Sequence, residues 1–329
     1  MSIAEPNTVF SAGSARFLRL RPPLDIKVPI PGGFRLESDA PLSDRHICVC
    51  RYGRWDAPPV LVMGGISAGR TLAGDNGWWN DIVGPHRPID LQNYAALGLD
   101  FAPAVDERVH ISPRDQARLI VEALDHLGID TLHALVGASY GGMVGLALGA
   151  LAPARVGSLC VISAGHRPAP LASAWRGVQR RMVEFALRRG EPEQGLALAR
   201  QLAMISYRSA DEFEQRFDGI LDVEGASDLD RYLIARGEAY SNTMAPRRWL
   251  SLSESIDRAH ITPETVNVPT TLVACPSDQI VPFQLMTELA ERLPNLTALH
   301  ALPSLYGHDA FLKEPERLGA IIDSFLKAA

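Results

Sequence analysis

The chain has 329 residues, of which 47% are hydrophobic and 21% are charged, and its formal net charge is −6. These values are typical of a globular protein with a sizeable core, either one large α/β domain or a domain that carries an insertion. Charged residues form no long run of one sign, so nothing favours nucleic acid or an anionic membrane surface as a partner.

The cysteines and histidines indicate neither a disulfide framework nor a metal site. Cys160 and Cys275 lie in apolar, strand-like runs, where a buried free thiol is the ordinary state. Cys48 and Cys50 would point to opposite faces of one strand, which suits neither a disulfide nor a shared metal. The histidines are dispersed, and we expect no metal. No apolar leader or membrane-length run is found, which predicts a cytoplasmic protein that does not bind membranes.

In chain order, residues 1–28 are polar and irregular, and we expect no regular structure there. Residues 45–52 alternate between polar and apolar side chains, as an early antiparallel strand does. Residues 60–63 form an unbroken apolar run, which predicts a parallel strand buried on both faces. The run leads into Gly64-Gly65-Ile66, a loop whose N–H groups can approach a ligand.

Two adjacent tryptophans, Trp78 and Trp79, follow, and we expect them in the core. The clearest helix of the chain comes next. Ser112 is a capping residue, Pro113 suits the first turn, and Gly128 ends the apolar periodicity.

The sequence Gly137-Ala138-Ser139-Tyr140-Gly141 matches the G-x-S-x-G pattern and stands between an apolar run and small residues. A serine becomes a useful nucleophile when a sharp strand-to-helix turn presents it to a base, and glycines relieve the crowding in that turn. The N–H groups of the following helix point toward an oxyanion formed at Ser139. We expect Tyr140 and Ile66 to supply the oxyanion N–H groups. The alternative is a glycine-rich turn without chemistry.

Beyond a further buried strand at residues 159–162, residues 166–260 contain helical patterns and no strand-like run. This stretch is predicted to be a helical lid inserted in a core made of residues 1–165 and 261–329. Strands and helices alternate again after it, so we expect a mostly parallel sheet flanked by helices. The lid patterns span residues 175–187, 194–206 and 229–239, and the later elements span 269–274, 284–293, 298–302 and 315–326.

A nucleophilic serine needs a base, and the base needs an acid that orients it. In this class of fold the acid and the histidine follow the serine in that order. Asp278 comes directly after the strand at 269–274, and His308 comes after the last short strand. Both fall at strand C-termini, where open α/β sheets bind ligands. We therefore predict a triad of Ser139, Asp278 and His308. A turn or cap residue is the alternative for Asp278, and a surface loop residue for His308.

From about residue 45 to 326 the chain resembles the homoserine O-acyltransferase family of the α/β-hydrolase superfamily. The resemblance is carried by GASYGGM at 137–143, by HDAFL at 308–312, and by GLALAR at 195–200 with ISYR at 205–208. It implies an α/β-hydrolase fold with a helical lid. It also implies acyl transfer, in methionine biosynthesis, from acetyl-CoA or succinyl-CoA to the hydroxyl of homoserine through an acyl-serine intermediate.

The resemblance further implies that Arg200 binds the carboxylate of homoserine and Asp309 its ammonium, an assignment that suits the two charges. The alternatives are a lid salt bridge for Arg200 and a helix N-cap for Asp309. Arg180 also matches a lid arginine of the family. Acyl-CoA would be a co-substrate, with no permanently bound cofactor, and a homodimer would form through lid residues 170–260.

The chain also departs from the family. Tyr140 stands where the family usually has methionine, the segment between residues 99 and 109 is shortened, and the lid is trimmed. These differences surround the acyl-donor side, so the choice between acetyl and succinyl stays open. The acceptor stays open between homoserine and serine. Two rival functions also stay open, namely a plain esterase or thioesterase with the same triad and a binding module without catalysis.

Overall fold

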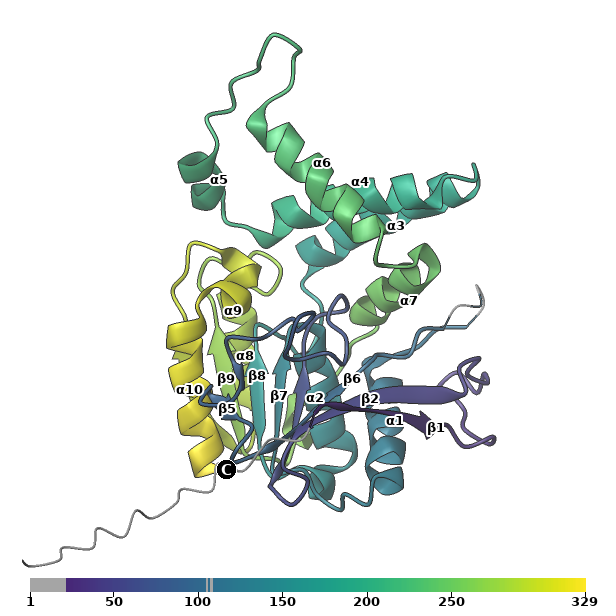
Figure 1. The fold of residues 1–329 in the computed structure, drawn as a ribbon, viewed down its shortest axis with the longest axis vertical. Coiled ribbons are helices and arrows are strands. Elements are labelled where there is room, and N and C mark those ends of the chain that lie inside the picture. The colour runs from purple at the N-terminus through teal and green to yellow at the C-terminus, as the bar shows by residue number, and fades with distance from the viewer. Residues whose placement is uncertain (1–21, 105, 107–108) are drawn as a thin grey trace, which may run out of the picture.

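The computed structural model describes residues 22–104, 106 and 109–329. Within these residues, eight strands form one sheet in the order β1-β2-β6-β3-β7-β8-β9-β10 (Figure 1). Strand β2 is antiparallel to both of its neighbours, and all pairs from β6 to β10 are parallel. The strands are β1 Leu24–Pro29, β2 His46–Gly53, β3 Pro59–Met63, β6 Ala95–Leu99, β7 Ala134–Ala138, β8 Leu159–Ile162, β9 Thr270–Ala274 and β10 Leu296–Ala301, and β4 Val83–Gly84 pairs separately with β5 Ile89–Asp90.

Helices cover both faces of this sheet, which explains why its central strands are apolar throughout. All five residues of β7 are buried, and successive side chains enter different cores. Leu135 packs on the side of α1 Pro113–His126, α2 Tyr140–Leu151 and α8 Phe283–Arg292. Val136 packs on the side of α10 Pro315–Ala328. The predicted mostly parallel sheet flanked by helices is confirmed.

Five helices lie between β8 and β9 and stand beyond one end of the sheet (Figure 1). Helix α4 packs closely on α3 and α6 because glycine faces the neighbouring helix. A methyl group on Gly195 would lie 2.4 Å from the Cβ of Ala186, and one on Gly237 would lie 2.5 Å from the carbonyl of Ala197. The helices are α3 Pro170–Leu187, α4 Pro192–Tyr207, α5 Ala210–Arg216, α6 Asp228–Ser241 and α7 Pro246–Asp257. The three helical patterns in the sequence correspond to α3, α4 and α6.

Two strands differ from the expectation. Strand β1 lies at the end of the segment 1–28 that was expected to be irregular, and residues 1–21 of that segment lie outside the described residues. An edge strand buries one face only, so Val28 is covered while its neighbours stay exposed or half-buried. Strand β6 is rich in alanine and glycine, which weakens the hydrophobic pattern by which a buried strand is predicted from sequence. Gly98 is needed there because a methyl group would lie 2.2 Å from the carbonyl of Arg70.

Four smaller features can be compared with the expectations. Helix α1 begins with a capping box between Ser112 and Asp115. Of the two tryptophans expected in the core, Trp79 is buried, while Trp78, on whose ring it stacks at 4.7 Å between centroids, is half-buried. All four cysteines are free thiols. None of the helices in the described part of the chain combines the length and the apolar composition needed to span a bilayer.

Candidate active site

Ser139 occupies a strained turn between β7 and α2. Its φ of 54° and ψ of −122° lie in a region that L-residues rarely adopt. The flanking glycines are required by close contacts. A methyl group on Gly141 would lie 2.6 Å from the carbonyl oxygen of Met63, and one on Gly137 would lie 2.5 Å from the carbonyl of Gly141. The turn therefore lifts the serine clear of the sheet, as a G-x-S-x-G elbow does.

The structure brings Ser139, His308 and Asp278 together in a hydrogen-bonded chain. Ser139 Oγ lies 2.9 Å from His308 Nε2, and His308 Nδ1 lies 2.7 Å from Asp278 Oδ2. The other carboxylate oxygen of Asp278 accepts hydrogen bonds from the N–H groups of Ile280 and Val281, at 2.8 and 2.9 Å. The aspartate is thus fixed, and it orients the imidazole with Nε2 toward the serine.

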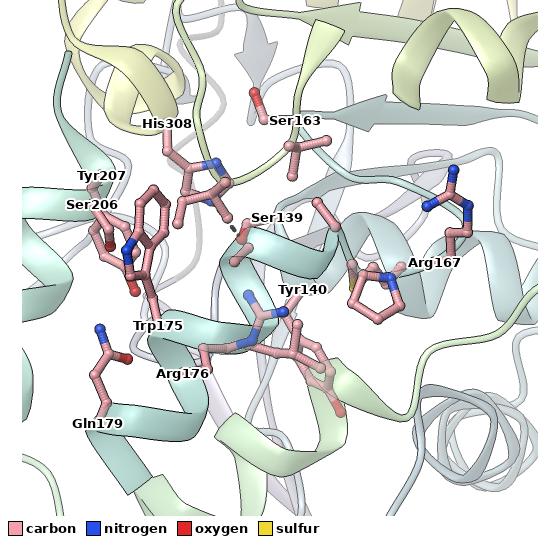
Figure 2. Close-up of a pocket in the computed structure, with 17 residues that line it drawn as sticks. Ser139, Tyr140, Ser163, Arg167, Trp175, Arg176, Gln179, Ser206, Tyr207 and His308 are labelled. Carbon is pink, nitrogen blue, oxygen red and sulfur yellow. Dashed lines mark hydrogen bonds between the residues drawn. The ribbon is translucent and has the colours of Figure 1, made fainter. Parts of the chain in front are cut away.

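The environment of His308 favours its protonated form. Burial alone would lower the pKa of His308, but the charge and hydrogen bond of Asp278, helped by the charge of Asp309, raise that pKa above its usual 6.5. Figure 2 shows the imidazole pointing at the serine across a short hydrogen bond. A base with a raised pKa accepts a proton readily, and a carboxylate beside it stabilises the resulting imidazolium.

Most backbone N–H groups at the start of α2 already have an acceptor within the protein. Gly141 N–H donates to the carbonyl of Gly64, and Gly142 and Met143 donate to the carbonyl of Ser139. Within the described residues, the N–H of Tyr140 has no such acceptor, and neither has that of Ile66. The loop that carries Ile66 lies beside the serine, since a methyl group on Gly65 would be 3.8 Å from Ser139 Oγ. Both predicted oxyanion donors are therefore available next to the nucleophile.

A pocket opens on Ser139 and His308, and one wall of it comes from helix α3 (Figure 2). Arg176 on this wall is 8% exposed, and its Nε lies 3.0 Å from Asp257 Oδ1. Tyr140 lines the floor and is fully buried, with its hydroxyl 2.6 Å from Ser255 Oγ. Burial raises the pKa of Tyr140 well above its ordinary value, so this hydroxyl stays neutral. The pocket is also lined by Arg167, Trp175, Gln179 and Tyr207.

Neither Arg200 nor Asp309 lines this pocket; Asp309 follows His308 in the chain, and Arg200 reaches toward His308 only through Tyr207. The Arg200 guanidinium lies 5.5 Å from the ring centroid of Tyr207 and 4.7 Å from that of Tyr240. The ring of Tyr207 in turn lies 5.6 Å from that of His308. The charge of Arg200 is not neutralised, because no carboxylate of the described residues pairs with it.

Asp309 has a protein partner that the sequence did not predict. Its Oδ2 lies 3.0 Å from Nε of Arg208, although the two are not aligned for a hydrogen bond. Arg208 also donates to both carboxylate oxygens of Glu212, at 2.8 and 3.0 Å. One buried arginine is thus shared by two buried carboxylates, and Glu212 also lies 3.5 Å from Nη1 of Arg216.

Sequence reasoning did not predict that four further residues lie at this site, namely Arg208, Tyr207, Arg176 and Gln179. The first two stand in the ISYR motif, so the motif itself was the available signal. Arg176 and Gln179 are one helical turn apart and both buried, and a polar pair on the buried face of an amphipathic helix was the signal there. No cluster of three or more metal-ligating side chains occurs among the residues that the structure describes.

A serine, a histidine and an aspartate bonded in this order beyond the strand ends of a mostly parallel sheet are the arrangement typical of an α/β-hydrolase fold. A family profile described as alpha/beta hydrolase fold matches residues 87–315, more than half of the chain. The chain also belongs to the homoserine O-acyltransferase family, as its similarity to curated relatives shows.

A homoserine O-succinyltransferase of Xanthomonas campestris is 41% identical over 284 residues, which cover 84% of this chain and 77% of that protein. A homoserine O-acetyltransferase of Geobacter sulfurreducens is 30% identical over 345 residues, covering 89% of this chain and 94% of the relative. Among solved structures, a homoserine O-acetyltransferase from Bacillus anthracis superposes with a TM-score of 0.81 at 16% identity, over 93% of this chain and 97% of the other. Esterase E22 superposes with a TM-score of 0.80 at 16% identity, over 93% and 99%. At these identities the superpositions show a shared fold.

Proposed function

We propose that this protein transfers an acyl group from acyl-CoA to the hydroxyl of homoserine, through an ester on Ser139, in methionine biosynthesis in the cytoplasm. The observation that carries the proposal is the hydrogen-bonded chain Ser139–His308–Asp278 in a member of this family. The use of acyl-CoA, an intracellular metabolite, supports the location.

In the first half-reaction Ser139 Oγ attacks the thioester carbonyl carbon while its proton passes to His308 Nε2. The oxyanion that forms is stabilised by the N–H groups of Tyr140 and Ile66. When the carbon–sulfur bond breaks, the CoA sulfur takes the proton from His308, so CoA leaves as the thiol. The acyl group remains as an ester on Ser139, and His308 is neutral again.

In the second half-reaction the homoserine hydroxyl attacks the acyl-serine carbonyl and gives its proton to His308 Nε2. The same N–H groups stabilise the second oxyanion. The bond to Ser139 Oγ then breaks, and His308 returns the proton to that oxygen. The products are O-acylhomoserine and the original enzyme, so every proton is accounted for.

An esterase or thioesterase would run the same first step and use water in the second, and esterases share this fold. A transferase must position its acceptor so that it outcompetes water. Release of free thiol from acetyl-CoA and succinyl-CoA, with homoserine, serine or no acceptor, tests the proposal. We expect release to depend on homoserine. Equal release without any acceptor would identify a thioesterase, and preference for serine would identify a serine O-acyltransferase.

We propose that Arg200 binds the carboxylate of homoserine and that Asp309 binds its ammonium. Two features support this. The charge of Arg200 is unneutralised, and it is stacked on the tyrosine that touches His308. The carboxylate of Asp309 lies 3.0 Å from Nε of Arg208 without a hydrogen bond between them, so it can still accept an ammonium group. A zwitterion that lies across His308 would meet a positive group at one end and a negative group at the other.

Arg200→Lys and Asp309→Ala are expected to slow the second half-reaction far more than the first. Acylation of Ser139 involves neither charge of homoserine, so the burst of CoA should survive in both variants. Turnover should fall tens- to thousands-fold, because the loss of one charged partner in a desolvated site costs about 2–5 kcal/mol. Arg200→Lys keeps the charge but loses the planar fork.

Burst amplitude and steady-state rate, measured across homoserine concentrations, check this. Arg189→Lys is a matched control, because that arginine also stacks on an aromatic ring, that of Phe185, at the exposed end of α3. An unchanged apparent affinity for homoserine in both test variants would contradict the assignment.

The pH profile should report the state of His308. A general base must be neutral, and the pKa of His308 lies above 6.5, so kcat/KM should fall on the acid side with a midpoint above 6.5. Because Asp309 contributes to raising that pKa, Asp309→Asn should move the midpoint to lower pH. The measurement is kcat/KM for acyl-CoA from pH 5 to 9. A midpoint that does not move in Asp309→Asn would mean that the charge of Asp309 does not affect the pKa of His308.

We propose a homodimer formed through helices α3, α4 and α6. Large apolar side chains are exposed on these helices, with Phe185 at 51%, Leu198 at 54% and Ile234 at 47%, and such surface is costly to leave in water. Sedimentation at micromolar concentration should give a dimer. Leu198→Asp should shift the protein toward monomer, whereas the same change at the exposed Leu312, outside this segment, should not. A monomeric wild type would contradict the proposal.

A further inference from the structure

We propose that the inserted helices hold both oxyanion donors in place through two pairs of hydroxyl groups, and that Ser255 and Tyr240 are therefore positioning residues for the reaction. Ser255 on α7 pairs with Tyr140, and Tyr240 on α6 pairs with Ser67. Tyr140 carries one of the two proposed donor N–H groups, and Ser67 directly follows Ile66, which carries the other. The inference rests on the proposed acyl transfer, because both of its half-reactions form an oxyanion.

The pair on α7 is enclosed in the protein. The hydroxyl of Tyr140 lies 2.6 Å from Ser255 Oγ, and both residues are fully buried. The tyrosine ring is fixed as well, since it meets Phe101 edge to face at 4.7 Å between centroids. Figure 2 shows the Tyr140 side chain directed away from His308, so its hydroxyl does not act on the reacting atoms. Its anchorage instead fixes the backbone of the residue that carries the donor N–H.

The pair on α6 holds the loop that follows β3. The N–H of Ala68 donates to the carbonyl of Gly65 at 2.9 Å, which closes a turn with Ile66 and Ser67 at its two middle positions. The hydroxyl of Tyr240 lies 2.9 Å from Ser67 Oγ, which has no other partner among the described residues. A contact at one middle residue of a turn restrains the peptide that joins it to the other. The bond from α6 therefore restrains the donor N–H of Ile66.

Tyr240 has a second contact, because its ring lies 4.7 Å from the guanidinium of Arg200. Burial raises the pKa of Tyr240 to about 12, so its hydroxyl stays neutral and keeps the bond to Ser67 at neutral pH. Tyr240→Phe keeps the ring beside Arg200 and removes only the hydroxyl. This variant thus separates the restraint on the oxyanion loop from the binding of homoserine.

A positioning role has a kinetic signature that a purely structural role lacks. The oxyanion forms at the same place in both half-reactions, so a displaced donor should slow acylation and deacylation by the same factor. Equal slowing leaves the KM of each substrate unchanged. Loss of a whole donor costs about 100- to 1000-fold in kcat, so a displaced donor should cost roughly five- to fifty-fold. A bond that only stabilises the fold would lower the amount of active protein and leave both rate constants unchanged.

The experiment measures acylation and turnover in Ser255→Ala, Tyr240→Phe and Ser67→Ala. The burst of p-nitrophenol from p-nitrophenyl acetate gives the acylation rate constant, and its amplitude gives the fraction of active protein. Thiol release from acyl-CoA across homoserine concentrations gives kcat and KM. We expect the acylation rate constant and kcat to fall together by roughly five- to fifty-fold, while the burst amplitude and the KM for homoserine stay as in wild type.

Two matched controls separate the hydroxyl pairs from the helices that carry them. Ser251 on α7 also bonds to the sheet domain, at the N–H of Ala104 at 2.8 Å, but to neither residue with a donor N–H. Tyr232 on α6 is half-buried, and its hydroxyl bonds to no described residue. Ser251→Ala and Tyr232→Phe should leave the acylation rate constant unchanged. A loss in Ser251→Ala as large as that in Ser255→Ala would mean that α7 acts as a whole, and would overturn the assignment.

A double variant and Tyr140→Phe complete the test. Tyr240→Phe and Ser67→Ala remove the two ends of one bond, so the double variant should be no slower than either single variant. Tyr140→Phe removes the other end of the buried bond and keeps the proposal testable if Ser255→Ala does not fold. Unchanged acylation in these variants, additive losses in the double variant, or a loss confined to turnover with homoserine would overturn the inference. Failure of the proposed function would look different, because wild type would then release p-nitrophenol but no homoserine-dependent thiol.

Discussion

Ser139→Ala is expected to lower kcat by roughly a hundred thousand- to a million-fold, because no acyl-enzyme can form without the serine oxygen. The fold should be retained. The Ser139 side chain has one hydrogen bond, to His308, and alanine adds no atom to the crowded turn. The measurement is thiol release from acyl-CoA under saturating homoserine, combined with mass spectrometry of the intact protein after a brief exposure to acyl-CoA.

The acyl adduct should be present on wild type and missing from Ser139→Ala. His308→Ala should be nearly as inactive, and the double variant should be hardly worse than either one, since residues that act as a unit are strongly non-additive. Additive losses in the double variant would mean that the two residues act in separate steps. An adduct on Ser139→Ala would place the nucleophile elsewhere.

Asp278→Asn is expected to lower kcat by about ten thousand-fold while the geometry of the site is kept. The asparagine amide can place an N–H toward Nδ1 of His308, which forces the proton onto Nε2 and removes the lone pair that must accept the serine proton. The N–H groups of Ile280 and Val281 now bond to one aspartate oxygen, and the asparagine oxygen can take over that role. The folded state should therefore lose little stability.

This expectation is checked by kcat and by the acid limb of the pH profile together. The charge of Asp278 raises the pKa of His308, so the residual activity of Asp278→Asn should have its acid midpoint at lower pH than wild type. Asp309→Asn provides the contrast. It should also move the acid midpoint to lower pH, but it leaves the hydrogen bond by which Asp278 orients His308 intact. Near-full activity of Asp278→Asn would mean that another group orients His308.

The positions of Ser139, Asp278 and His308 could be predicted from the sequence, because each depends on a short motif or on its place after a strand. The G-x-S-x-G turn needs glycines for reasons confined to a few residues, and the structure shows those contacts at Gly137 and Gly141. The positions of Asp278 and His308 follow from the rule that ligands gather at strand ends. The edge strand β1 was missed because one buried face gives a weak pattern.

The polar partners could not be predicted, because they depend on how helices far apart in sequence come together. The link between Arg176 and Asp257 spans 81 residues, and that between Arg208 and Asp309 joins the end of α4 to the segment after β10. A buried arginine and a surface arginine look the same in a helical pattern. Whether Asp309 holds a substrate, an arginine or both is therefore decided by packing and charge balance.

The last helix of the insertion is fastened to the sheet domain at three points. Ser251 Oγ accepts from the N–H of Ala104 at 2.8 Å, Glu254 lies 2.9 Å from His110, and Ser255 holds the hydroxyl of Tyr140 at 2.6 Å. Asp257 on the same helix binds two arginines of α3.

We therefore expect helices α3 and α7 to stay fixed over Ser139 rather than to open and close. Tyr140 directly follows Ser139, and its N–H is one of the two proposed oxyanion donors, so tilting α7 would pull on the residue beside the proposed nucleophile. Helix α6, by contrast, packs mainly on α4. Helix α6 is nevertheless held to the sheet domain as well, since its Tyr240 hydroxyl lies 2.9 Å from Ser67 Oγ on the loop that carries Ile66, so a movement of either α6 or α7 would reach one of the two proposed oxyanion donors.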